Sequence, residues 1–418
     1  MTQVTPSPAE GAAKTPNMAF AELVGLVAAA MALNALAIDM MLPALGQIGA
    51  DLGAAQDNDR QLIIVLYVVA NGLSQLLFGP IVDRFGRKRV LLWSLAGYTM
   101  ASVFCVMAPT FTTLIVARMI QGASTAATRV AAVAIVRDLH SGRTMAKVMS
   151  FAVTVFMAAP IIAPALGQIV LAFGPWRMIF AVLLFYGVAL TVWVAFRTPE
   201  TLTPEKTKPI DARVIAATYG QFLGNKTAMG YTIAAAFCFG ALFGYISASE
   251  QIFLETFEIG DRFAIAFAAI AISLAAASFL NASLVSRYGM RRLTHWALAL
   301  FIVVNIIHFA IVYMLGDKFL VFMTCTSLSF FALGLIGPNT NAIVMEPMGH
   351  IAGAAAAAHG FAGTTLAGAL GGLVARAYDG TTLPIVIGFV AFGAIALAIV
   401  YWTEDGKLFQ PHHSDDAP

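Results

Sequence analysis

Gly79-Pro80-Ile81-Val82-Asp83-Arg84-Phe85-Gly86-Arg87-Lys88-Arg89-Val90 separates two long apolar runs of the sequence. Five of the seven residues from Asp83 to Arg89 are charged, and four of these five are basic. A turn this short cannot cross a bilayer, so both apolar runs must return to the same side of it. An excess of Arg and Lys marks the cytoplasmic side, so the stretch predicts the orientation of the whole chain.

The composition places the chain in a membrane. Of its 418 residues, 60% are hydrophobic and 11% are charged, and the mean hydropathy is +0.83. Water-soluble domains of this size are far less apolar, so we expect an integral membrane protein. The net charge of +2 gives no indication of nucleic acid binding. The three cysteines lie in apolar segments without metal-ligand spacing, and we expect no metal, no disulfide and no cofactor.

Twelve apolar stretches are long enough to cross a bilayer as helices, which takes about 20 residues each. Strands are excluded because they would be about ten residues long and would alternate in polarity. The predicted spans are 20–42, 62–82, 90–108, 112–136, 148–173, 178–196, 228–249, 263–284, 293–315, 319–343, 352–375 and 383–402. The expected fold class is an all-α membrane protein with twelve transmembrane helices in two six-helix pseudo-repeat halves.

A polar interval with three prolines, from 197 to 227, divides these spans six and six. With this topology seventeen of the 24 Lys and Arg residues are cytoplasmic, five are periplasmic and two lie within a span. This bias predicts that both termini are cytoplasmic. The first apolar stretch is too long for the core of a signal peptide, so we expect it to remain as a helix. We expect a disordered cytoplasmic N-terminus (1–18), a first half (19–197), a cytoplasmic linker (198–227), a second half (228–403) and a cytoplasmic tail (404–418).

A degenerate internal repeat relates the two halves. Arg84-Phe85-Gly86-Arg87-Lys88 recurs 203 positions later as Arg287-Tyr288-Gly289-Met290-Arg291, again after the second span of its half. Ser286 stands where the first copy has Asp83. Two repeated halves around a midplane cavity are typical of a transporter. The sequence has no Walker-type phosphate-binding loop and no catalytic constellation, so we expect a carrier driven by an ion gradient rather than an enzyme.

The opening stretch resembles the signature loop of the major facilitator superfamily, with six residues at the family positions: Gly79, Asp83, Arg84, Gly86, Arg87 and Lys88. We expect these residues to form a conformational latch. Glycine at position 79 would let helices approach closely, and Gly86 suits a tight turn. Asp83 would lie against the positive N-terminus of the eleventh span, after Pro347 and His350. The alternative, a simple positive-inside anchor, explains the basic residues but not the glycines or Asp83.

Two further stretches resemble motifs of this superfamily. The first, 114–122 in the fourth span, contains Arg118, about 9 Å below the periplasmic end at 1.5 Å per residue. A guanidinium at that depth must face water or a carboxylate, unless it snorkels to the surface. The second, 159–167 in the fifth span, resembles the motif that marks exporters. Its residues Pro160, Pro164 and Gly167 predict a gating helix, with a static kink as the alternative.

Asp39-Met40-Met41-Leu42-Pro43 ends the first span and resembles the Asp-Met-Tyr-Leu-Pro stretch of the Bcr/CflA (bicyclomycin-resistance type) drug/proton antiporters. Met41 replaces the family tyrosine. Arg137-Asp138 and Tyr245-Ile246-Ser247-Ala248-Ser249 add to the likeness, although Glu250 follows where the family has proline. The resemblance covers roughly 20–400 and implies proton-coupled export.

Asp39 is expected at about the same depth as Arg118, so the two charges can meet in the central cavity as a proton-coupling pair. Burial favours a protonated carboxyl group and a nearby guanidinium favours the charged form, so relative movement would switch protonation. A structural salt bridge, or a cap near Pro43, is the alternative. Glu250, close to Glu255, belongs either to a solvated acidic loop, which we favour, or to a cavity mouth that attracts cations.

The remaining polar residues in the spans carry weaker expectations. The substrate cavity is assigned to Asn34, Gln121, Tyr245 and Glu250. His308 and His359 are lone histidines on apolar helices and are expected to be packed. Arg129 is expected to snorkel to the cytoplasmic surface or to pair with Asp83.

The resemblance implies efflux of small amphipathic drug-like compounds across a bacterial inner membrane, by alternating access and in exchange for protons. The expected partners are a small-molecule substrate, protons and the lipid bilayer, with the chain acting as a monomer. A proton symporter that imports a nutrient remains the alternative. It would share the first two motifs, and only the fifth-span motif and the Asp39 stretch argue against it.

Overall fold

The structure, a computed structural model, describes residues 18–203 and 211–410. Its first six long helices are α1 (Phe20–Asp39), α3 (Leu62–Phe85), α4 (Arg87–Met107), α5 (Phe111–Leu139), α6 (Gly142–Phe173) and α7 (Arg177–Arg197). The later ones are α9 (Lys226–Gln251), α10 (Phe263–Tyr288), α11 (Met290–Leu315), α12 (Phe319–Met345), α13 (Ala352–Phe361), α14 (Ala367–Arg376) and α15 (Leu383–Thr403). No strand occurs in either described range. The predicted disordered N-terminus, apart from Met18, and residues 411–418 of the predicted tail lie outside these ranges.

Eleven continuous helical segments of the described chain are long and apolar enough to cross a membrane. One of them, Phe319–Arg376, has 58 residues, enough for two spans. It folds back on itself, because the backbone N–H of Thr382, just after its end, donates to Asp317, just before its start, at 3.2 Å. Within it, α13, a π-helical turn (Ala362–Leu366) and α14 together form the eleventh span. The structure therefore confirms the twelve predicted spans.

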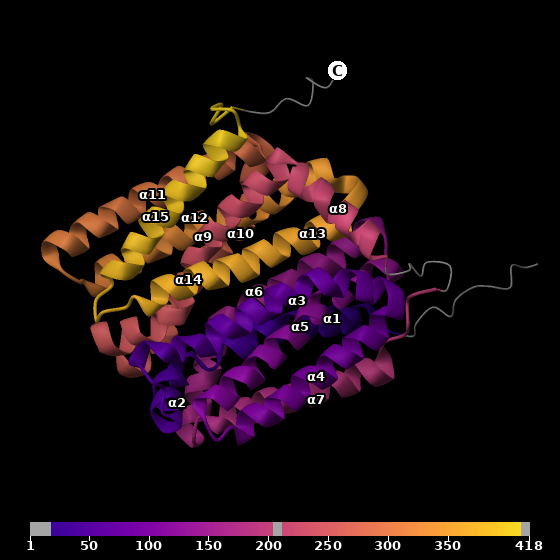
Figure 1. Cartoon of the computed structure of the whole chain (residues 1–418), viewed down its shortest axis with the longest axis horizontal. Coiled ribbons are helices and arrows are strands. Elements are labelled where there is room, and N and C mark those ends of the chain that lie inside the picture. The colour runs from indigo at the N-terminus through magenta and orange to yellow at the C-terminus, as the bar shows by residue number, and fades with distance from the viewer. Residues whose placement is uncertain (1–17, 204–210, 411–418) are drawn as a thin grey trace, which may run out of the picture.

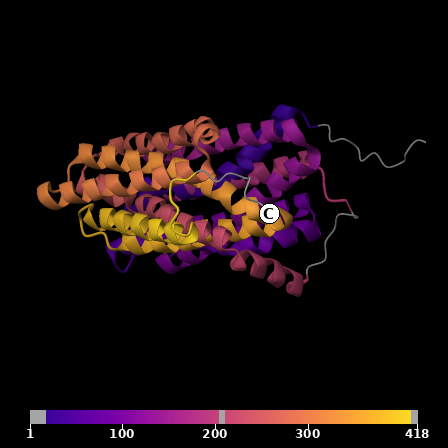
Figure 2. The same ribbon diagram turned by 90° about the horizontal axis from the view of Figure 1, so that it is seen from above.

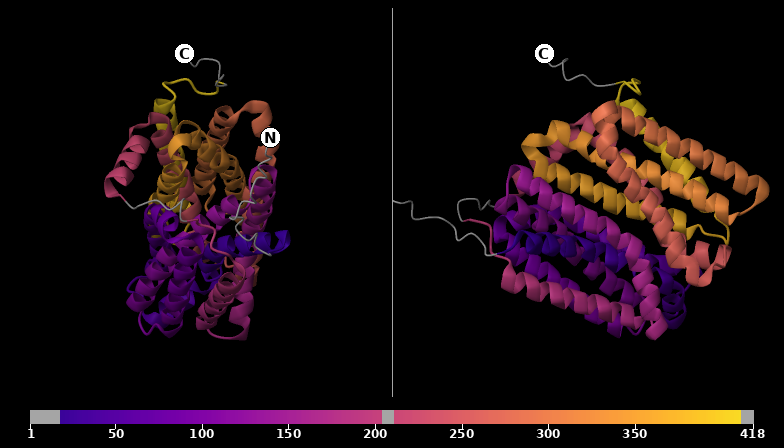
Figure 3. Two further views of the ribbon diagram at one scale, coloured as in Figure 1. Left: turned by 90° about the vertical axis from the view of Figure 1, so that its right-hand side faces the viewer. Right: turned by 180° about the vertical axis from the view of Figure 1, so that it is seen from behind.

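The helices assemble into two bundles of six, which lie side by side (Figure 1). In the first half α5 packs between α3 and α4, and α1 packs on α6. In the second half α9 packs on α14 and α15, and α12 packs between α10 and α11. Seen from above, the helices run along one common direction (Figure 2), and the view from behind separates the two halves clearly (Figure 3). The halves touch mainly where α6 meets α10 and where α3 meets α13 and α14.

The ends of the helices define two faces of the molecule. We call the side where α3 ends and α4 begins the basic face, because residues 84–89 lie there. The side where α1 ends and α3 begins is the opposite face. It carries the short helix α2 (Leu45–Leu52) and a 3₁₀ turn (Asp57–Gln61) before α3. Neither of these two elements was predicted from the sequence.

Glycines make the matching turns of the internal repeat. Gly86, between α3 and α4, has φ 103° and ψ 148°, and Gly289, between α10 and α11, has φ 78° and ψ 156°. L-residues with a side chain rarely adopt such positive φ values, so both turns require glycine. The same backbone conformation at the same place in each half confirms the repeat read from the sequence.

A helix within the predicted linker, α8 (Ala212–Gly224), docks on the opening stretch. Pro80 lies inside α3 and has no N–H, so it leaves the carbonyl of Leu76, four residues earlier, without its helical donor. The hydroxyl of Tyr219 donates to that carbonyl at 3.0 Å. Burial raises the pKa of Tyr219, which keeps the hydroxyl a neutral donor. The linker is thereby bound to the first half at the proline.

Candidate transport site

A network of uncharged polar side chains lies between α1, α3 and α5 in the first half. The hydroxyl of Tyr67 donates to Asn34 Oδ1 at 2.8 Å and lies 3.0 Å from Thr125 Oγ1. Asn71 Nδ2 donates to the carbonyl of Gly122 at 3.1 Å and to Thr125 Oγ1 at 2.9 Å. Interhelical hydrogen bonds of this kind fix helix packing inside a membrane. Asn34 therefore lies in a bonded network, on the side of α1 that faces α3.

Arg118 occupies the centre of this half and is fully buried. Its Nε donates to the carbonyl of Ile63 at 3.2 Å, its Nη2 to the carbonyl of Ala37 at 3.0 Å, and its Nη1 to Gln121 Oε1. The guanidinium carbon lies 4.1 Å from the ring centre of Tyr67. Carbonyl oxygens and an aromatic face therefore stabilise the charge. Snorkelling to the surface, the alternative raised from the sequence, is wrong.

Asp39 lies at the end of α1 and is 3% exposed. Its Oδ1 is buried and has no hydrogen-bond partner, and its carboxylate forms no ion pair with any described residue. The predicted contact with Arg118 is therefore absent from this conformation. The guanidinium is bound instead by the carbonyl of Ala37, two residues before Asp39, by the carbonyl of Ile63 and by Gln121. A buried carboxylate without a partner is costly in its charged form.

The predicted gating helix packs directly on the Asp39 stretch. A Cβ atom added to Gly167 would lie 1.9 Å from the carbonyl oxygen of Met40 and 3.2 Å from Pro43. Only glycine permits this approach of α6 to the end of α1. The helix itself runs unbroken from Gly142 to Phe173 with Pro160 and Pro164 inside it. The fold thus places two motifs more than 120 positions apart in direct contact.

Tyr245 faces the same region from the second half, within an aromatic cluster. Its ring centre lies 5.5 Å from that of Phe267 and 4.9 Å from that of Phe330. The residue is 1% exposed, and its buried hydroxyl has no hydrogen-bond partner. Each half therefore contributes one buried polar group, Asp39 and Tyr245, that has no hydrogen-bond partner among the described residues.

Glu250 does not belong to a solvated loop, which was the favoured expectation. The residue is 5% exposed, and its Oε2 lies 3.5 Å from Arg60 Nη1. Its Oε1 accepts a hydrogen bond from the backbone N–H of Gly46 at 3.2 Å. Arg60 also pairs with Glu255. Both contacts of Glu250 join the first half to the second on the opposite face.

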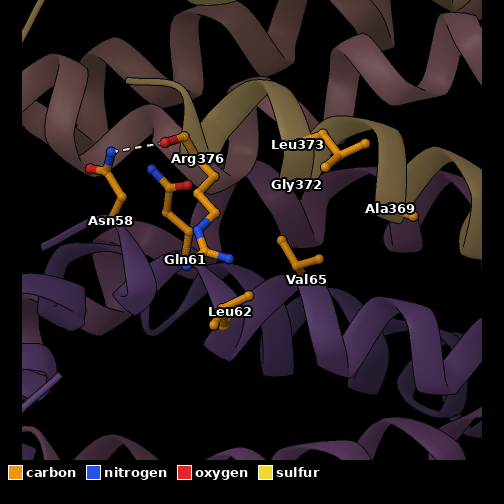
Figure 4. A pocket seen from close by; sticks show the side chains of 8 residues that line it. All are labelled: Asn58, Gln61, Leu62, Val65, Ala369, Gly372, Leu373 and Arg376. Carbon is orange, nitrogen blue, oxygen red and sulfur yellow. Dashed lines mark hydrogen bonds between the residues drawn. The ribbon is translucent and has the colours of Figure 1, made fainter. Parts of the chain in front are cut away.

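Further polar contacts continue this junction, which we call the opposite-face seal. Asn58 donates to the carbonyl of Arg376 at 2.9 Å (Figure 4). It also donates to the carbonyl of Tyr378 at 2.8 Å, and Arg376 pairs with Asp59 at 2.8 Å. Gln251 donates to Asn58 Oδ1 at 2.7 Å. Burial raises the pKa of Tyr378, so its hydroxyl remains protonated and donates to the carbonyl of Gln251.

A small pocket, of about 120 Å³, lies beside these contacts. It is lined by Asn58, Gln61, Leu62, Val65, Ala369, Gly372, Leu373 and Arg376, from both halves (Figure 4). A pocket this small suits a few water molecules but not a drug-sized ligand, which takes about 300 Å³ or more. The seal therefore leaves no ligand-sized opening at this point.

On the basic face, the signature loop binds within its own half. Asp83 pairs with Arg87 at 3.0 Å, and Arg87 also pairs with Asp138 at 2.9 Å. The backbone N–H of Arg87 donates to Glu200 at 2.8 Å. Lys88 donates to the carbonyl of Ala195, near the end of α7, at 2.8 Å. All of these partners lie within the first half or directly after it.

Two expectations for this loop do not hold in this conformation. Asp83 does not contact the start of α13, because Arg87, one turn along the chain, binds its carboxylate instead. A Cβ atom added to Gly79 would meet nothing within 4 Å, so no helix approaches there. Arg84 is exposed.

His308, His359 and Arg129, the remaining titratable residues predicted within spans, have different surroundings. His308 is buried, and neither ring nitrogen has a partner. The Nδ1 atom of His359 lies 3.0 Å from the hydroxyl of Thr232. Arg129 is exposed and has no ion pair with Asp83 or with any other described residue.

Arg60 and Tyr67 were not predicted as site residues from the sequence, although both are central to these contacts. The available signal for Arg60 was the charged run 57–60 at the start of a span, on the same side as the acidic run 250–261. Opposite charges on the same side of the membrane predict a contact, but they do not specify which residues pair.

Twelve membrane-spanning helices in two pseudo-repeated halves, with polar groups buried between the helices, define a multi-pass secondary transporter. A profile of the Major Facilitator Superfamily matches residues 27–372. The chain belongs to this superfamily.

Named relatives extend the likeness. The chain is 30% identical over 354 residues to an uncharacterized MFS-type transporter, YdgK, of Bacillus subtilis, covering 81% of this chain and 84% of that one. It is 27% identical over 383 residues to a bicyclomycin resistance protein homolog of Haemophilus influenzae, covering 89% and 93%. It is 31% identical over 274 residues to the multidrug resistance protein MdtL of Klebsiella pneumoniae, covering 64% and 68%. These matches agree with the resemblance read from the sequence.

A solved structure supports the fold. The human organic anion transporter MFSD10 (TETRAN) superposes with a TM-score of 0.69, covering 92% of this chain and 99% of that one, at 17% sequence identity. At this identity the likeness establishes the fold alone.

Proposed function

We propose that this chain exports small amphipathic drug-like compounds across a bacterial inner membrane in exchange for protons, acting as a monomer with both termini in the cytoplasm. The names of two relatives, a bicyclomycin resistance protein homolog and a multidrug resistance protein, support the direction and the substrate class. The excess of Arg and Lys on the basic face supports its assignment to the cytoplasm. The opposite face is then periplasmic.

Asp39 carries the proposal. Its carboxylate is buried at the end of a membrane helix without a partner, where the carbonyl ends of the helix also disfavour negative charge. Binding a proton, or a substrate group that donates a hydrogen bond, relieves that cost. Proton and substrate thus compete for one group, which is what antiport requires. Tyr245, whose buried hydroxyl has no partner among the described residues, is proposed as the second-half group that such a substrate would meet.

The contacts between the halves support alternating access, with this conformation closed on the opposite face. The opposite-face seal closes the periplasmic side through Arg60, Glu250 and their neighbours. At the basic face Asp83 is bound within its own half and makes no contact with α13. In the proposed outward-facing state the seal opens and Asp83 docks against the start of α13. A ligand shifts this equilibrium only by binding the two states differently.

Asp39→Asn tests the coupling role. In everted membrane vesicles energised with a proton gradient, the variant should lose gradient-driven uptake of a fluorescent drug but still exchange it down its own gradient. Asp57→Asn, an exposed carboxylate on the opposite face, is the matched control and should behave as wild type. Full gradient-driven uptake by Asp39→Asn would remove the proposed role. Loss of substrate from vesicles on energisation would instead favour the symporter.

A further inference from the structure

Arg129 differs from the other span arginine, Arg118, in having no protein partner. Arg118 is fully buried and bound by carbonyl oxygens, whereas Arg129 is exposed and has no hydrogen bond or ion pair with any described residue. A charged side chain within a membrane span must face water, a ligand or the bundle interior. The position of Arg129 decides between these environments.

The helix register places Arg129 towards the second half. α3 and α5 both run from the opposite face to the basic face, and Asn71 bonds to Gly122 and Thr125. One helical turn further along, Gln75 therefore lies at about the level of Arg129. Gln75 Nε2 donates across the junction to Thr364 Oγ1 at 3.2 Å. Arg129 thus lies at a level where the two halves meet.

His359 approaches the same point from α13. The neighbouring Gly360 packs on Gln75, because a Cβ atom there would lie 2.3 Å from Gln75 Oε1. His359 is adjacent to Gly360 on α13, and Gln75, on which Gly360 packs, lies at about the level of Arg129, so His359 and Arg129 reach the junction at the same level from the two halves. The Nδ1 atom of His359 is bound to the hydroxyl of Thr232 on α9, and its Nε2 has no partner among the described residues. In the tautomer in which the Thr232 hydroxyl donates to Nδ1, the neutral ring carries its proton on Nε2 and can donate it to a ligand.

No carboxylate of the described residues forms an ion pair or a hydrogen bond with either group. The side chains bonded around them, Gln75, Thr232 and Thr364, are uncharged. Arg129 makes no ion pair in the part of the chain that the structure describes. Glu250, which from the sequence would favour cations, is occupied by Arg60 on the other side of the membrane. The junction near the basic face therefore has an excess of positive charge and free donors.

We propose that Arg129 and His359 form an oxyanion-binding site on the cytoplasmic side of the transport pathway, and that the preferred substrates carry a carboxylate, phosphate or sulfonate. This assignment rests on the proposed export function and names its substrate class as anionic or zwitterionic amphipaths. The guanidinium fork of Arg129 binds two oxygens of such a group, and His359 Nε2 donates from the second half. A ligand held by both halves can act on the equilibrium between them.

Binding of 2-naphthoate and of the uncharged 2-naphthamide to the purified chain tests the site. Both compounds share one ring system, and only the former carries an oxyanion. In phosphatidylcholine nanodiscs, 2-naphthoate should raise the unfolding temperature at lower concentration than 2-naphthamide does. Arg129→Gln should weaken 2-naphthoate binding about tenfold and leave 2-naphthamide unaffected, as expected for one lost charge-assisted contact. His359→Gln should weaken it severalfold.

Arg143→Gln, an exposed and unpaired arginine at the start of α6, is the control and should bind both compounds as wild type does. If Arg129→Gln does not fold, Arg129→Lys keeps the charge but loses the fork and should bind 2-naphthoate with intermediate affinity. Equal binding of the two compounds, no 2-naphthoate binding, or unchanged binding by the Arg129 variants overturns the site. Repeating the measurement in phosphatidylglycerol nanodiscs distinguishes a transported substrate from a lipid headgroup as the ligand of this site. If this lipid abolishes the 2-naphthoate effect, a lipid headgroup is the ligand and the substrate assignment is wrong.

The proposed export function is tested by the vesicle transport experiment and not by this binding experiment. Binding to nanodiscs needs no gradient, so 2-naphthoate can bind through Arg129 even if the chain exports nothing. Export of an uncharged drug that survives in Arg129→Gln, by contrast, would retain the function and confine this residue to anionic substrates.

Discussion

Replacing Arg60 with alanine should open the opposite-face seal. Arg60 and Glu250 have side chains that are 10% and 6% exposed, whereas Glu255 is 45% exposed. Removing one partner of a buried pair costs about 3 kcal/mol or more, because the other charge stays buried and unpaired. The exposed pair with Glu255 adds less than about 1 kcal/mol.

The cost of leaving Glu250 buried and unpaired applies only to the conformation in which the opposite face is closed. In a state open on this face, water reaches Glu250 and the penalty disappears. Arg60→Ala should therefore favour the open state by about 3 kcal/mol, a change of roughly a hundredfold in the population ratio. Adding Glu250→Gln removes the unpaired charge and should recover much of the closed population. The two single variants and the double variant form a cycle that isolates the coupling.

Spin labels on the opposite face measure this shift. Asp57→Cys and Asp379→Cys place labels on exposed residues of the two halves, and the three native cysteines are buried. Pulsed dipolar spectroscopy should show a longer-distance population in Arg60→Ala that is minor in the parent. Arg262→Ala removes an exposed, unpaired arginine from the same face and should leave the distances unchanged. An unaltered distance distribution in Arg60→Ala would refute the idea that this cluster holds the face closed.

Further substitutions test the packing of the gating helix and of the linker helix. Gly167→Ala places a methyl group 1.9 Å from the carbonyl of Met40, so it should lower the unfolding temperature or abolish export, whereas Gly363→Ala meets nothing within 4 Å and should do neither. Tyr219→Phe leaves the carbonyl of Leu76 without a donor and should cost about 1 kcal/mol of stability, measured by thermal unfolding. Wild-type stability of Tyr219→Phe would mean that water replaces the hydroxyl without loss.

The spans could be predicted closely because crossing a bilayer requires only a run of apolar residues, which the sequence shows directly. Predicted starts at residues 20, 62, 263, 319, 352 and 383 coincide with those of the corresponding helices. The short helices α2 and α8 were missed for a physical reason. Helices of eight and thirteen residues are marginal on their own and depend on tertiary contacts.

Pairings between distant charges could not be predicted. The sequence showed that Glu250 and Arg60 were charged and on the same side of the membrane, but the loop alternative was equally consistent with that. Arg60 and Glu255 are 195 positions apart, and no local pattern specifies such a contact. Asp83 illustrates a second limit, because one sequence must satisfy at least two conformations of a transporter, and the proposed docking on α13 concerns a conformation that this structure does not describe.

If Asp39 is the proton-coupling residue, as proposed above, the corner between α1 and α2 provides a route by which its proton can influence a seal formed by other residues. Asp39 ends α1, the carbonyl of the next residue, Met40, contacts Gly167, and the backbone N–H of Gly46 donates to Glu250. Five residues beyond Met40, α2 has already begun, so the corner is a short, tightly packed unit rather than a free loop. Any movement of the end of α1 that follows a change in the charge of Asp39 must therefore displace either α6, through Gly167, or the hydrogen bond to Glu250. Displacement of that bond weakens the contact that closes the opposite face, which couples the proton site to the seal through the backbone itself.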